Sequence, residues 1–431
     1  MPSTRLNRRT MLKSSALATA GVWVAGGTRA AESKSANEKL NIAVIGIGGR
    51  GGANLGGVSG ENIVALCDVD DQRAGKAYEK HSKAKKFFDF RQMLDEMERE
   101  IDAVVISTPD HTHFHPAIMA MERGKHCYCE KPMAHAVWEV RRMTELAREK
   151  KLATQLGVQR HTLSHVHRSV ELIKAGAIGE VREVHAWVGG SRGMPSAPDK
   201  FPPVPDHLKW DLWQGPVAER KYSPAYAPYN WRFWWDYGTG ETGNWGCHIL
   251  DIAFWALDLR YPTEVETTGP EVDAERTPKS LHAQFKFPQR GKLPPCDLHW
   301  YHTGSGPAIL AEKNLPRKGN TLFIGSEGML LCGFGEHMLY PEEKNEEYKS
   351  LDSTIPKSPG FHKEWIAACK GGDPATCHFD YSGPLTETVL LGNVSYRVGE
   401  KLVWDAEAAK VTNTSAANEL IRPVYRKGWE I

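Results

Sequence analysis

Three glycines near residue 50 have the spacing of a dinucleotide-binding turn. The stretch IAVIGIGGRGG places Gly46, Gly48 and Gly51 in the pattern G-x-G-x-x-G, directly after an apolar run. The first glycine permits a tight turn, the second lets backbone amides approach a pyrophosphate, and the third allows a helix to pack closely on a strand. We therefore predict that this turn, including Gly49 and Arg50, binds the pyrophosphate of a nicotinamide dinucleotide.

An acidic residue follows where a ribose ligand is expected. The second apolar run, NIVALCDVD, leads to Asp68, about 20 residues after Gly46. A carboxylate at this position binds the ribose 2′-hydroxyl and repels a 2′-phosphate, so NAD is expected in preference to NADP. The plainer alternative is that Asp68 only caps the end of a strand.

Predicted strands and helices alternate around these residues. Apolar, β-branched runs at 103–107, 126–134 and 152–159 are separated by helical patterns at 116–124 and 136–150. Such alternation predicts an α/β fold whose N-terminal part, residues 38–160, is a Rossmann domain with a doubly wound parallel sheet. Its ligand should lie at the carboxyl ends of the strands.

Composition excludes several other classes of protein. The chain of 431 residues has a net charge of +1, with 41% hydrophobic and 25% charged residues, as in a globular protein of two or three domains. This balance argues against nucleic acid or an anionic membrane as the main partner. Eight cysteines without CxxC spacing do not make a disulfide scaffold. The stretches HTHFH (111–115) and HCYC (126–129) lack a second ligand pair at zinc spacing, so no metal is predicted.

The first 31 residues are typical of an export signal. A basic start is followed by a short apolar stretch (14–27) and by small residues at Ala30 and Ala31. That stretch is shorter than the roughly 20 residues of a membrane helix. RRTMLK (8–13) resembles the twin-arginine consensus, which predicts a Tat signal over residues 1–31, the Tat machinery as a partner, and a periplasmic or otherwise exported protein. A Sec signal or a buried N-terminal helix are the alternatives.

Longer stretches resemble one known family. STPDHTHFHPAIMAMERGKHCYCEKPMA (107–134), KAGAIGEVREVHAW (174–187) and WWDYGTGETGNWGCHILDIAFWALDL (234–259) resemble, in order and spacing, the Gfo/Idh/MocA superfamily of glucose–fructose oxidoreductase and inositol dehydrogenase, especially its exported members. The resemblance implies a C-terminal α+β domain over residues 161–431, built on a large, mainly antiparallel open sheet. It also implies a homodimer or homotetramer that associates through the open face.

The resemblance assigns the lysine of the EKP motif, Lys131, to a position beside the nicotinamide and the substrate hydroxyl. A partly desolvated ammonium can hold an alkoxide-like oxygen and help to move its proton. Glu130 and Pro132 would fix this lysine, and Pro132 is expected to follow a cis peptide bond. On the cofactor side the resemblance also places Thr108, Pro109, His113 and Gln159.

The second catalytic element of the family reads D-x-x-x-H-x-x-D. Here the corresponding residues are Asn244, His248 and Asp251, so the leading aspartate is an asparagine. Asparagine can hydrogen-bond a sugar hydroxyl but cannot take its proton. We therefore expect His248 to be the general base. Asp236 and Glu241 are candidates to assist it.

A proline-rich stretch before this element is crowded with aromatic residues. Half of the 14 tryptophans fall at positions 210, 213, 231, 234, 235, 245 and 255. Indole faces suit the C–H faces of sugar rings, although most of these residues are expected to pack the loop onto the sheet. The candidate substrate residues are Arg232, Trp235, Tyr237, His161 and Asn244.

These features predict an exported NAD(P)-dependent oxidoreductase that acts on a hydroxyl of a sugar, sugar derivative or cyclitol. An exported enzyme cannot exchange NADH with the cytoplasmic pool, so NAD is expected to stay bound and to be recycled in each catalytic cycle. Three alternatives remain open: an NAD-dependent glycosidase working by oxidation, elimination and reduction, a non-catalytic sugar- and NAD-binding protein, and a cytoplasmic dehydrogenase whose leader is misread.

Overall fold

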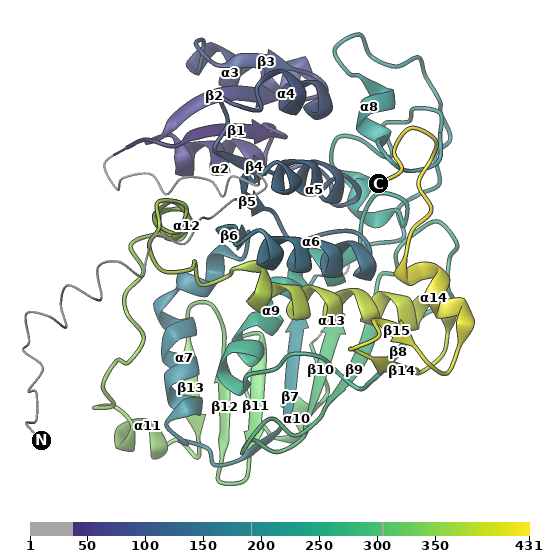
Figure 1. Ribbon diagram of the computed structural model, residues 1–431. Coiled ribbons are helices and arrows are strands. Elements are labelled where there is room, and N and C mark those ends of the chain that lie inside the picture. The colour runs from purple at the N-terminus through teal and green to yellow at the C-terminus, as the bar shows by residue number, and fades with distance from the viewer. Residues whose placement is uncertain (1–37, 191, 304–305) are drawn as a thin grey trace, which may run out of the picture. The chain divides into compact units, whose positions relative to one another are not determined.

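The computed structural model describes residues 38–190, 192–303 and 306–431 (Figure 1). The predicted signal, residues 1–31, lies outside this part of the chain. Among the helices of the described residues, none has the length and apolar character needed to cross a membrane.

The N-terminal half is built on a parallel sheet of six strands in the order β3-β2-β1-β4-β5-β6. Its strands are short, buried apolar runs, as in β4, where all four residues are buried. The chain order reverses between β1 and β4, so the carboxyl ends of these two strands form the topological switch point. The predicted doubly wound sheet is thus confirmed. Its elements are β1 (Asn41–Ile45), α2 (Arg50–Val58), β2 (Asn62–Cys67), α3 (Asp71–Lys80), β3 (Lys85–Phe87), α4 (Phe90–Glu96), β4 (Ala103–Ile106), η1 (Asp110–Thr112), α5 (Phe114–Glu122), β5 (His126–Cys129), α6 (Val137–Glu149) and β6 (Thr154–Leu156).

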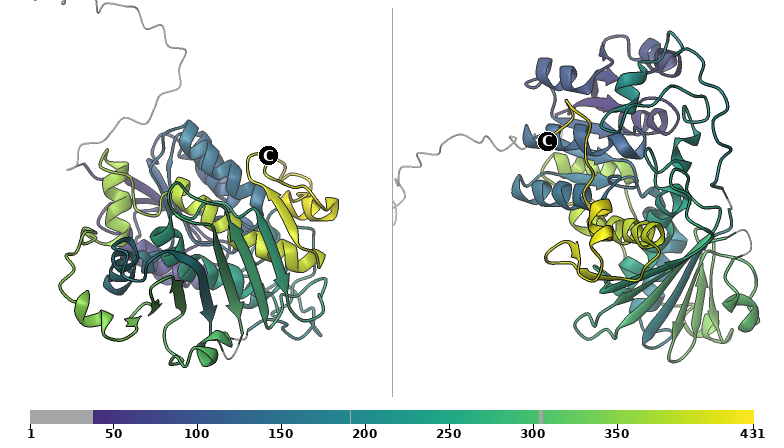
Figure 2. Two further views of the ribbon diagram at one scale, coloured as in Figure 1. Left: turned by 90° about the horizontal axis from the view of Figure 1, so that it is seen from below. Right: turned by 90° about the vertical axis from the view of Figure 1, so that its right-hand side faces the viewer.

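The C-terminal half is built on a nine-stranded sheet in the order β13-β12-β11-β7-β10-β9-β8-β14-β15. Among the strands of the described residues in this sheet, only β7 and β10 pair in parallel, which confirms the predicted, mainly antiparallel sheet. Its central strands alternate buried and less buried side chains, and α9 and α13 pack against this sheet (Figure 2). The strands are β7 (Val181–Val188), β8 (Glu264–Thr268), β9 (Leu281–Phe287), β10 (Cys296–His302), β11 (Thr321–Gly325), β12 (Met329–Cys332), β13 (His337–Tyr340), β14 (Leu402–Asp405) and β15 (Lys410–Val411). The helices are η2 (Gln159–Thr162), α7 (Ser164–Lys174), α8 (Trp210–Gln214), η3 (Asn230–Phe233), α9 (Gly240–Leu257), α10 (Ile309–Glu312), α11 (Lys344–Glu347), α12 (Phe361–Cys369), α13 (Phe379–Val398) and α14 (Ser415–Ile421).

Helix α13 joins the two halves. It packs against α6 of the first half and α9 of the second (Figure 1). At the first contact the Arg141 guanidinium donates to both carboxylate oxygens of Glu387, at 2.8 and 2.7 Å. Burial raises the pKa of Glu387, and the arginine opposes this shift. The predicted boundary between residues 160 and 161 falls within η2, and α12 returns to pack on α2.

The tryptophan-rich stretch forms a small aromatic core of its own, which contains α8 and η3. Its buried members are Leu208, Trp210, Trp213, Tyr226, Ala227, Trp231, Trp234 and Tyr237. Backbone hydrogen bonds tie the segment to the end of β2: Lys209 N–H donates to the Val69 carbonyl at 2.8 Å, and Asp71 N–H to the His207 carbonyl at 3.0 Å. This segment therefore lies over the carboxyl edge of the first sheet.

Candidate functional site

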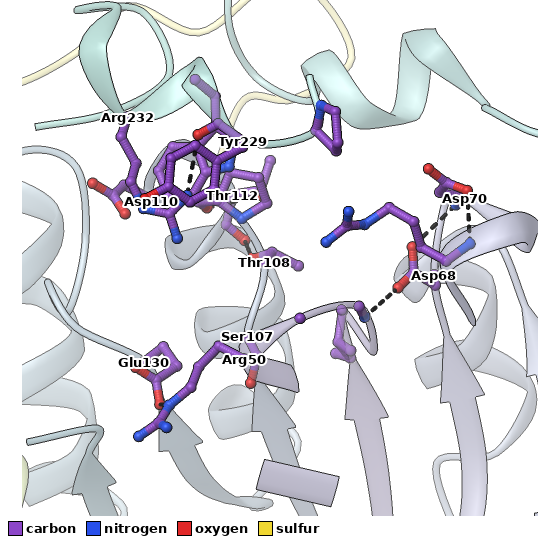
Figure 3. A pocket seen from close by; sticks show the side chains of 18 of the residues that line it. Arg50, Asp68, Asp70, Ser107, Thr108, Asp110, Thr112, Glu130, Tyr229 and Arg232 are labelled. Carbon is purple, nitrogen blue, oxygen red and sulfur yellow. Dashed lines mark hydrogen bonds and ion pairs between the residues drawn. The ribbon is translucent and has the colours of Figure 1, made fainter. Parts of the chain in front are cut away.

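A cavity of about 660 Å³ lies at the switch point of the first sheet, between the glycine turn and α9. Asp68 and Asp70 stand on one side of it, and Glu130 with Arg50 on the other (Figure 3). Many of the predicted site residues line its walls: Gly46, Gly48, Gly49, Arg50, Asp68, Thr108, Pro109, Glu130, Lys131, Gln159, Arg232, Asn244 and His248. Residues that are far apart in the sequence thus meet in one cavity.

The glycine turn leaves no room for side chains. Gly46 and Gly49 have φ angles of 78° and 57°, a region that L side chains rarely adopt. A Cβ atom on Gly51 would lie 1.9 Å from the Gly46 carbonyl oxygen, so this glycine permits the contact between turn and helix. Helix α2 begins at Arg50 without a side-chain cap. Backbone N–H groups at such a start suit a pyrophosphate, and the turn therefore fits the expected dinucleotide.

Asp68 accepts hydrogen bonds from the backbone of this turn. Its carboxylate accepts hydrogen bonds from the N–H groups of Ile47 at 2.7 Å, Gly48 at 3.2 Å and Asp70 at 3.0 Å. Burial raises the pKa of Asp68, and these backbone bonds oppose the shift. The carboxylate also lines the cavity, so it combines a strand-end cap with the position of a ribose ligand.

The Glu130 carboxylate lines the cavity and connects three other side chains. It accepts hydrogen bonds from Gln159 Nε2 at 2.7 Å, Asn54 Nδ2 at 2.9 Å and Arg50 Nε at 3.3 Å. A Cβ atom at Gly157 would lie 2.5 Å from the carboxylate, so the glycine makes space for it. The next peptide bond, Lys131–Pro132, is cis, as expected.

Lys131 is connected to α9 through the asparagine that replaces the family aspartate. Its Nζ donates to Asn244 Oδ1 at 3.1 Å, and Asn244 Nδ2 donates to Glu241 Oε2 at 2.9 Å. Glu241 is buried and forms an ion pair with Arg192. Burial lowers the pKa of Lys131, against the effects of Glu130 and Asp110. A carboxylate is thus linked to this lysine through Asn244, one turn earlier on α9 than the motif requires.

The other candidate assistant, Asp236, is engaged elsewhere. Its carboxylate accepts a hydrogen bond from Arg220 Nε at 2.6 Å, and Asp236 is not among the residues that line the cavity. Of the two acids considered, only Glu241 is linked to Lys131.

His248 faces the same cavity from the next turn of α9. Its buried Nδ1 has no hydrogen-bond partner among the described residues. Burial lowers its pKa well below the usual value of 6.5, and the charges of Lys131, Arg160 and Arg50 lower it further. The ring is therefore neutral at neutral pH and able to accept a proton.

These two pKa shifts predict a pH profile. A base with a lowered pKa stays unprotonated further into the acid range, so the acid limb of kcat/KM should lie well below pH 6.5. Because burial also lowers the pKa of Lys131 from 10.5, the alkaline limb should lie below pH 10.5. Initial rates across this range, compared with those of His248→Gln, check the assignment. An acid limb near pH 6.5 that persists in His248→Gln would contradict it.

Two predicted histidines lie outside the cavity walls. His113 places Nδ1 2.8 Å from the Pro132 carbonyl oxygen and Nε2 2.8 Å from that of Thr108, and so ties together the two turns that line the cavity. His161 places Nδ1 2.9 Å from the Asp251 carboxylate and stacks on Trp255 at 4.0 Å. Both histidines were expected to face a ligand, but neither lines the cavity. Their ring nitrogens instead bond neighbouring segments of the chain.

Gly51 also lies outside the cavity walls, because it packs against Gly46 behind the turn.

Two predicted aromatic residues lie outside the walls as well. Trp235 is buried and donates Nε1–H to the Asp273 carbonyl at 3.1 Å. Tyr237 is completely buried against Trp213, with ring centroids 4.9 Å apart. The expectation that these rings meet the substrate is corrected: Tyr237 belongs to the small aromatic core, and Trp235 is buried outside that core. A loop without periodicity gives no signal of which rings point inward.

Several wall residues were not predicted from the sequence. They include Asp110, Arg160, Tyr229, Trp231 and Trp245. Asp110 and Arg160 directly follow Pro109 and Gln159, which the resemblance had placed, and the rule that ligands lie at the carboxyl ends of parallel strands also points to these turns. Asn54 lies on α2, three positions after Gly51, and is buried. Its polar side chain on the buried face of this helix was the one sequence signal of its role.

Among the residues that the structure describes, two groups of side chains have ligand atoms close enough to hold a metal ion: His161, Asp251 and Cys377, and Glu183, His185 and His299. Neither group lines the cavity. In the described part of the chain, the HTHFH and HCYC stretches form no such group. The absence of a metal from this site stays a prediction.

Family comparisons cover both halves of the chain. Residues 40–158 match the family model described as "Oxidoreductase family, NAD-binding Rossmann fold", and residues 184–288 match "Oxidoreductase family, C-terminal alpha/beta domain".

Individual relatives match over shorter segments. Inositol 2-dehydrogenase of Salmonella typhimurium is 28% identical over 152 residues, 34% of this chain and 45% of the relative. A "Glycosyl hydrolase family 109 protein" of Solibacter usitatus is 31% identical over 207 residues, 41% of this chain and 44% of the relative. The chain spans less than half the length of the curated relatives it matches first.

Solved structures share the fold at low identity. The WlbA dehydrogenase from Bordetella pertussis, solved with NADH and UDP-GlcNAcA, has a TM-score of 0.61 at 18% identity, covering 85% of this chain and 99% of the other. An aldose–aldose oxidoreductase from Caulobacter crescentus, solved with glycerol, has a TM-score of 0.57 at 16% identity, covering 85% and 100%. At these identities the likeness establishes the fold alone.

Proposed function

Because this chain belongs to the Gfo/Idh/MocA oxidoreductase family, we propose that it is an NAD-dependent oxidoreductase acting on a hydroxyl group of a sugar, sugar derivative or cyclitol. One observation carries the proposal: Lys131, fixed between Glu130 and Asn244, shares a single cavity with a glycine turn that fits a pyrophosphate. The relatives that include an inositol dehydrogenase support the substrate class. Reduction of bound nucleotide by a panel of sugars and cyclitols tests it.

The chain's own residues handle the hydroxyl and its proton. Lys131 holds the hydroxyl oxygen, and burial lowers its pKa, which makes its ammonium a stronger proton donor than a solvated lysine. His248, neutral and facing the same cavity, accepts that proton. Asn244 orients the ammonium, while Glu241 fixes the amide of Asn244. A bound nicotinamide dinucleotide supplies the hydride acceptor for the carbon that bears the hydroxyl.

Asp68 gives the nucleotide preference proposed here, NAD over NADP. Removing its charge in Asp68→Asn should lower the ratio of NADP to NAD dissociation constants by about tenfold or more, because the carboxylate no longer repels a 2′-phosphate. Fluorescence titration with both reduced nucleotides measures this ratio. The neighbouring exposed Asp71, changed to Asn, is the matched control. An unchanged ratio in Asp68→Asn would refute the assignment.

The compartment is also part of the proposal. RRTMLK supports export through the Tat pathway to the periplasm, with the nucleotide bound before export and recycled within each cycle. Purified protein from the exported fraction should then carry bound nucleotide.

The oligomeric state is a separate proposal. We propose that the protein forms a dimer or tetramer through the open face of the nine-stranded sheet. Light scattering of the purified protein tests this.

A glycosidase is the second candidate. The Solibacter usitatus relative named for glycosyl hydrolase family 109 supports it, since the match is 31% identical and covers 41% of this chain. A glycosidase would release the chromophore from nitrophenyl glycosides without net reduction of its nucleotide. An oxidoreductase would reduce its nucleotide with free sugars and leave the glycosides intact.

A further inference from the structure

A second cavity adjoins the candidate site. It has a volume of about 480 Å³ and shares two wall residues, Arg160 and Trp245, with the first cavity. Its other walls include Trp187 at the end of β7, Asn320 before β11 and Phe334 after β12. A ligand whose reacting part lies beside Lys131 can therefore extend past Arg160 into this space.

The Arg160 guanidinium is held at the junction by two aromatic rings. Its central carbon lies 4.3 Å from the Phe334 ring centroid and 5.3 Å from that of Trp245. Such stacking fixes the guanidinium plane and leaves its N–H edge free to donate. No residue that the structure describes accepts a hydrogen bond from this guanidinium or forms an ion pair with it.

The acidic groups of the neighbourhood are already paired. Glu130 accepts from Arg50, Asn54 and Gln159, and Glu241 pairs with Arg192. Burial lowers the pKa of Arg160, with a further contribution from Arg50, as expected for a cation without a counter-ion. The junction therefore carries positive charge that the described protein residues leave uncompensated.

We propose that Arg160 is a specificity-determining residue that binds an anionic group of the carbohydrate, namely a carboxylate, a sulfate ester or a phosphate ester, on the part of the substrate that extends into the second cavity. A planar guanidinium matches the oxygen pairs of all three groups. The aromatic walls formed by Trp187 and Trp245 suit the apolar faces of a sugar ring next to that group. This inference rests on the proposed function, because it assigns a substrate class to the same site.

Matched sugars test the inference on the full chain loaded with NAD. Quenching of tryptophan fluorescence gives dissociation constants for glucose, glucuronate, glucose 6-sulfate and glucose 6-phosphate, and for galactose and galacturonate. We expect at least one anionic sugar to bind about tenfold or more tightly than its neutral partner. In Arg160→Gln this preference should fall to about twofold or less, with NAD affinity unchanged, while Arg160→Lys should retain part of it. The exposed Arg182, paired with Glu180, is the control, and Arg182→Gln should keep the full preference.

The three anionic glucose derivatives distinguish a carboxylate from either ester. Equal affinity for neutral and anionic partners, no binding by any anionic sugar, or a preference that survives in Arg160→Gln would each overturn the inference. Failure of the unmodified protein to bind NAD would instead overturn the proposed function.

Discussion

Replacing Lys131 by methionine is expected to lower kcat by about 10²–10⁴-fold while nucleotide affinity stays within about twofold. Methionine keeps the length and volume of the side chain but cannot hold an alkoxide-like oxygen or move a proton. Because the ammonium is desolvated and its pKa is lowered, its loss should leave the melting temperature unchanged or raise it. Steady-state rates, nucleotide titration and thermal unfolding of the same preparation measure the three effects.

Lys125 provides the matched control for this substitution. It precedes β5, at the opposite end of the strand from Lys131, and donates to the Glu98 carbonyl far from the cavity walls. Burial lowers its pKa as well, so Lys125→Met removes a comparable charge without touching the site. Turnover that is unchanged in Lys131→Met would refute the catalytic role and favour a non-catalytic sugar- and NAD-binding protein.

Substitution of Gly51 by alanine is expected to lower nucleotide affinity by at least about 100-fold and the free energy of unfolding by about 1–3 kcal/mol or more. The added Cβ would lie 1.9 Å from the Gly46 carbonyl oxygen and 2.8 Å from its carbon. Relief of this overlap requires α2 to move away from β1, which opens the turn that should hold the pyrophosphate. Chemical denaturation and nucleotide titration measure the two effects.

Gly56 lies on the same helix and gives the opposite expectation. Apart from the chain neighbours and the backbone of the helix itself, no described atom lies within 4 Å of a Cβ added there, and alanine is the better helix former. Gly56→Ala should therefore raise the free energy of unfolding by about 0.5–1 kcal/mol and leave nucleotide binding intact. If Gly51→Ala behaved like Gly56→Ala, the close packing of turn and helix would not be needed for nucleotide binding.

The sequence was most informative where chemistry depends on neighbours along the chain. Gly46, Gly48, Asp68 and Lys131 each follow an apolar strand, and a parallel sheet brings the carboxyl ends of such strands together. The mainly antiparallel second sheet was expected from the family resemblance, and the alternating burial along β9 and β10 agrees with it. Local rules of this kind account for the fold class, the glycine turn and Asp68, whereas Lys131 was placed by the family resemblance.

Contacts between distant segments were not predictable in this way. Asn54 and Gln159 meet at Glu130 across 76 and 29 positions of the chain, and Arg192 meets Glu241 across 49. The role of Asn244 also changed once the structure was known, because its amide links Lys131 to the carboxylate of Glu241. No local pattern encodes such pairings, because they arise only when distant segments pack together; the bond from Lys131 to Asn244 also spans the two halves.

The aromatic stretch shows a second limit of sequence reasoning. Trp235 and Tyr237 were expected in the cavity but belong to buried packing, whereas the neighbouring Trp231 lines it. In a helix or strand the side-chain period would assign each ring to a face, but this loop contains only the short helices α8 and η3. Only the packing of the folded chain decides which of these rings line the cavity.

The most direct test of the proposed function is the near-ultraviolet absorbance of the purified full chain as sugars and cyclitols are added without external nucleotide. We expect the protein to carry bound nucleotide, and at least one sugar or cyclitol to produce the absorbance of reduced nicotinamide in the unmodified protein but not in Lys131→Met. A purified protein that neither carries nor binds a nicotinamide dinucleotide, or one whose bound nucleotide no member of the panel reduces, would contradict it.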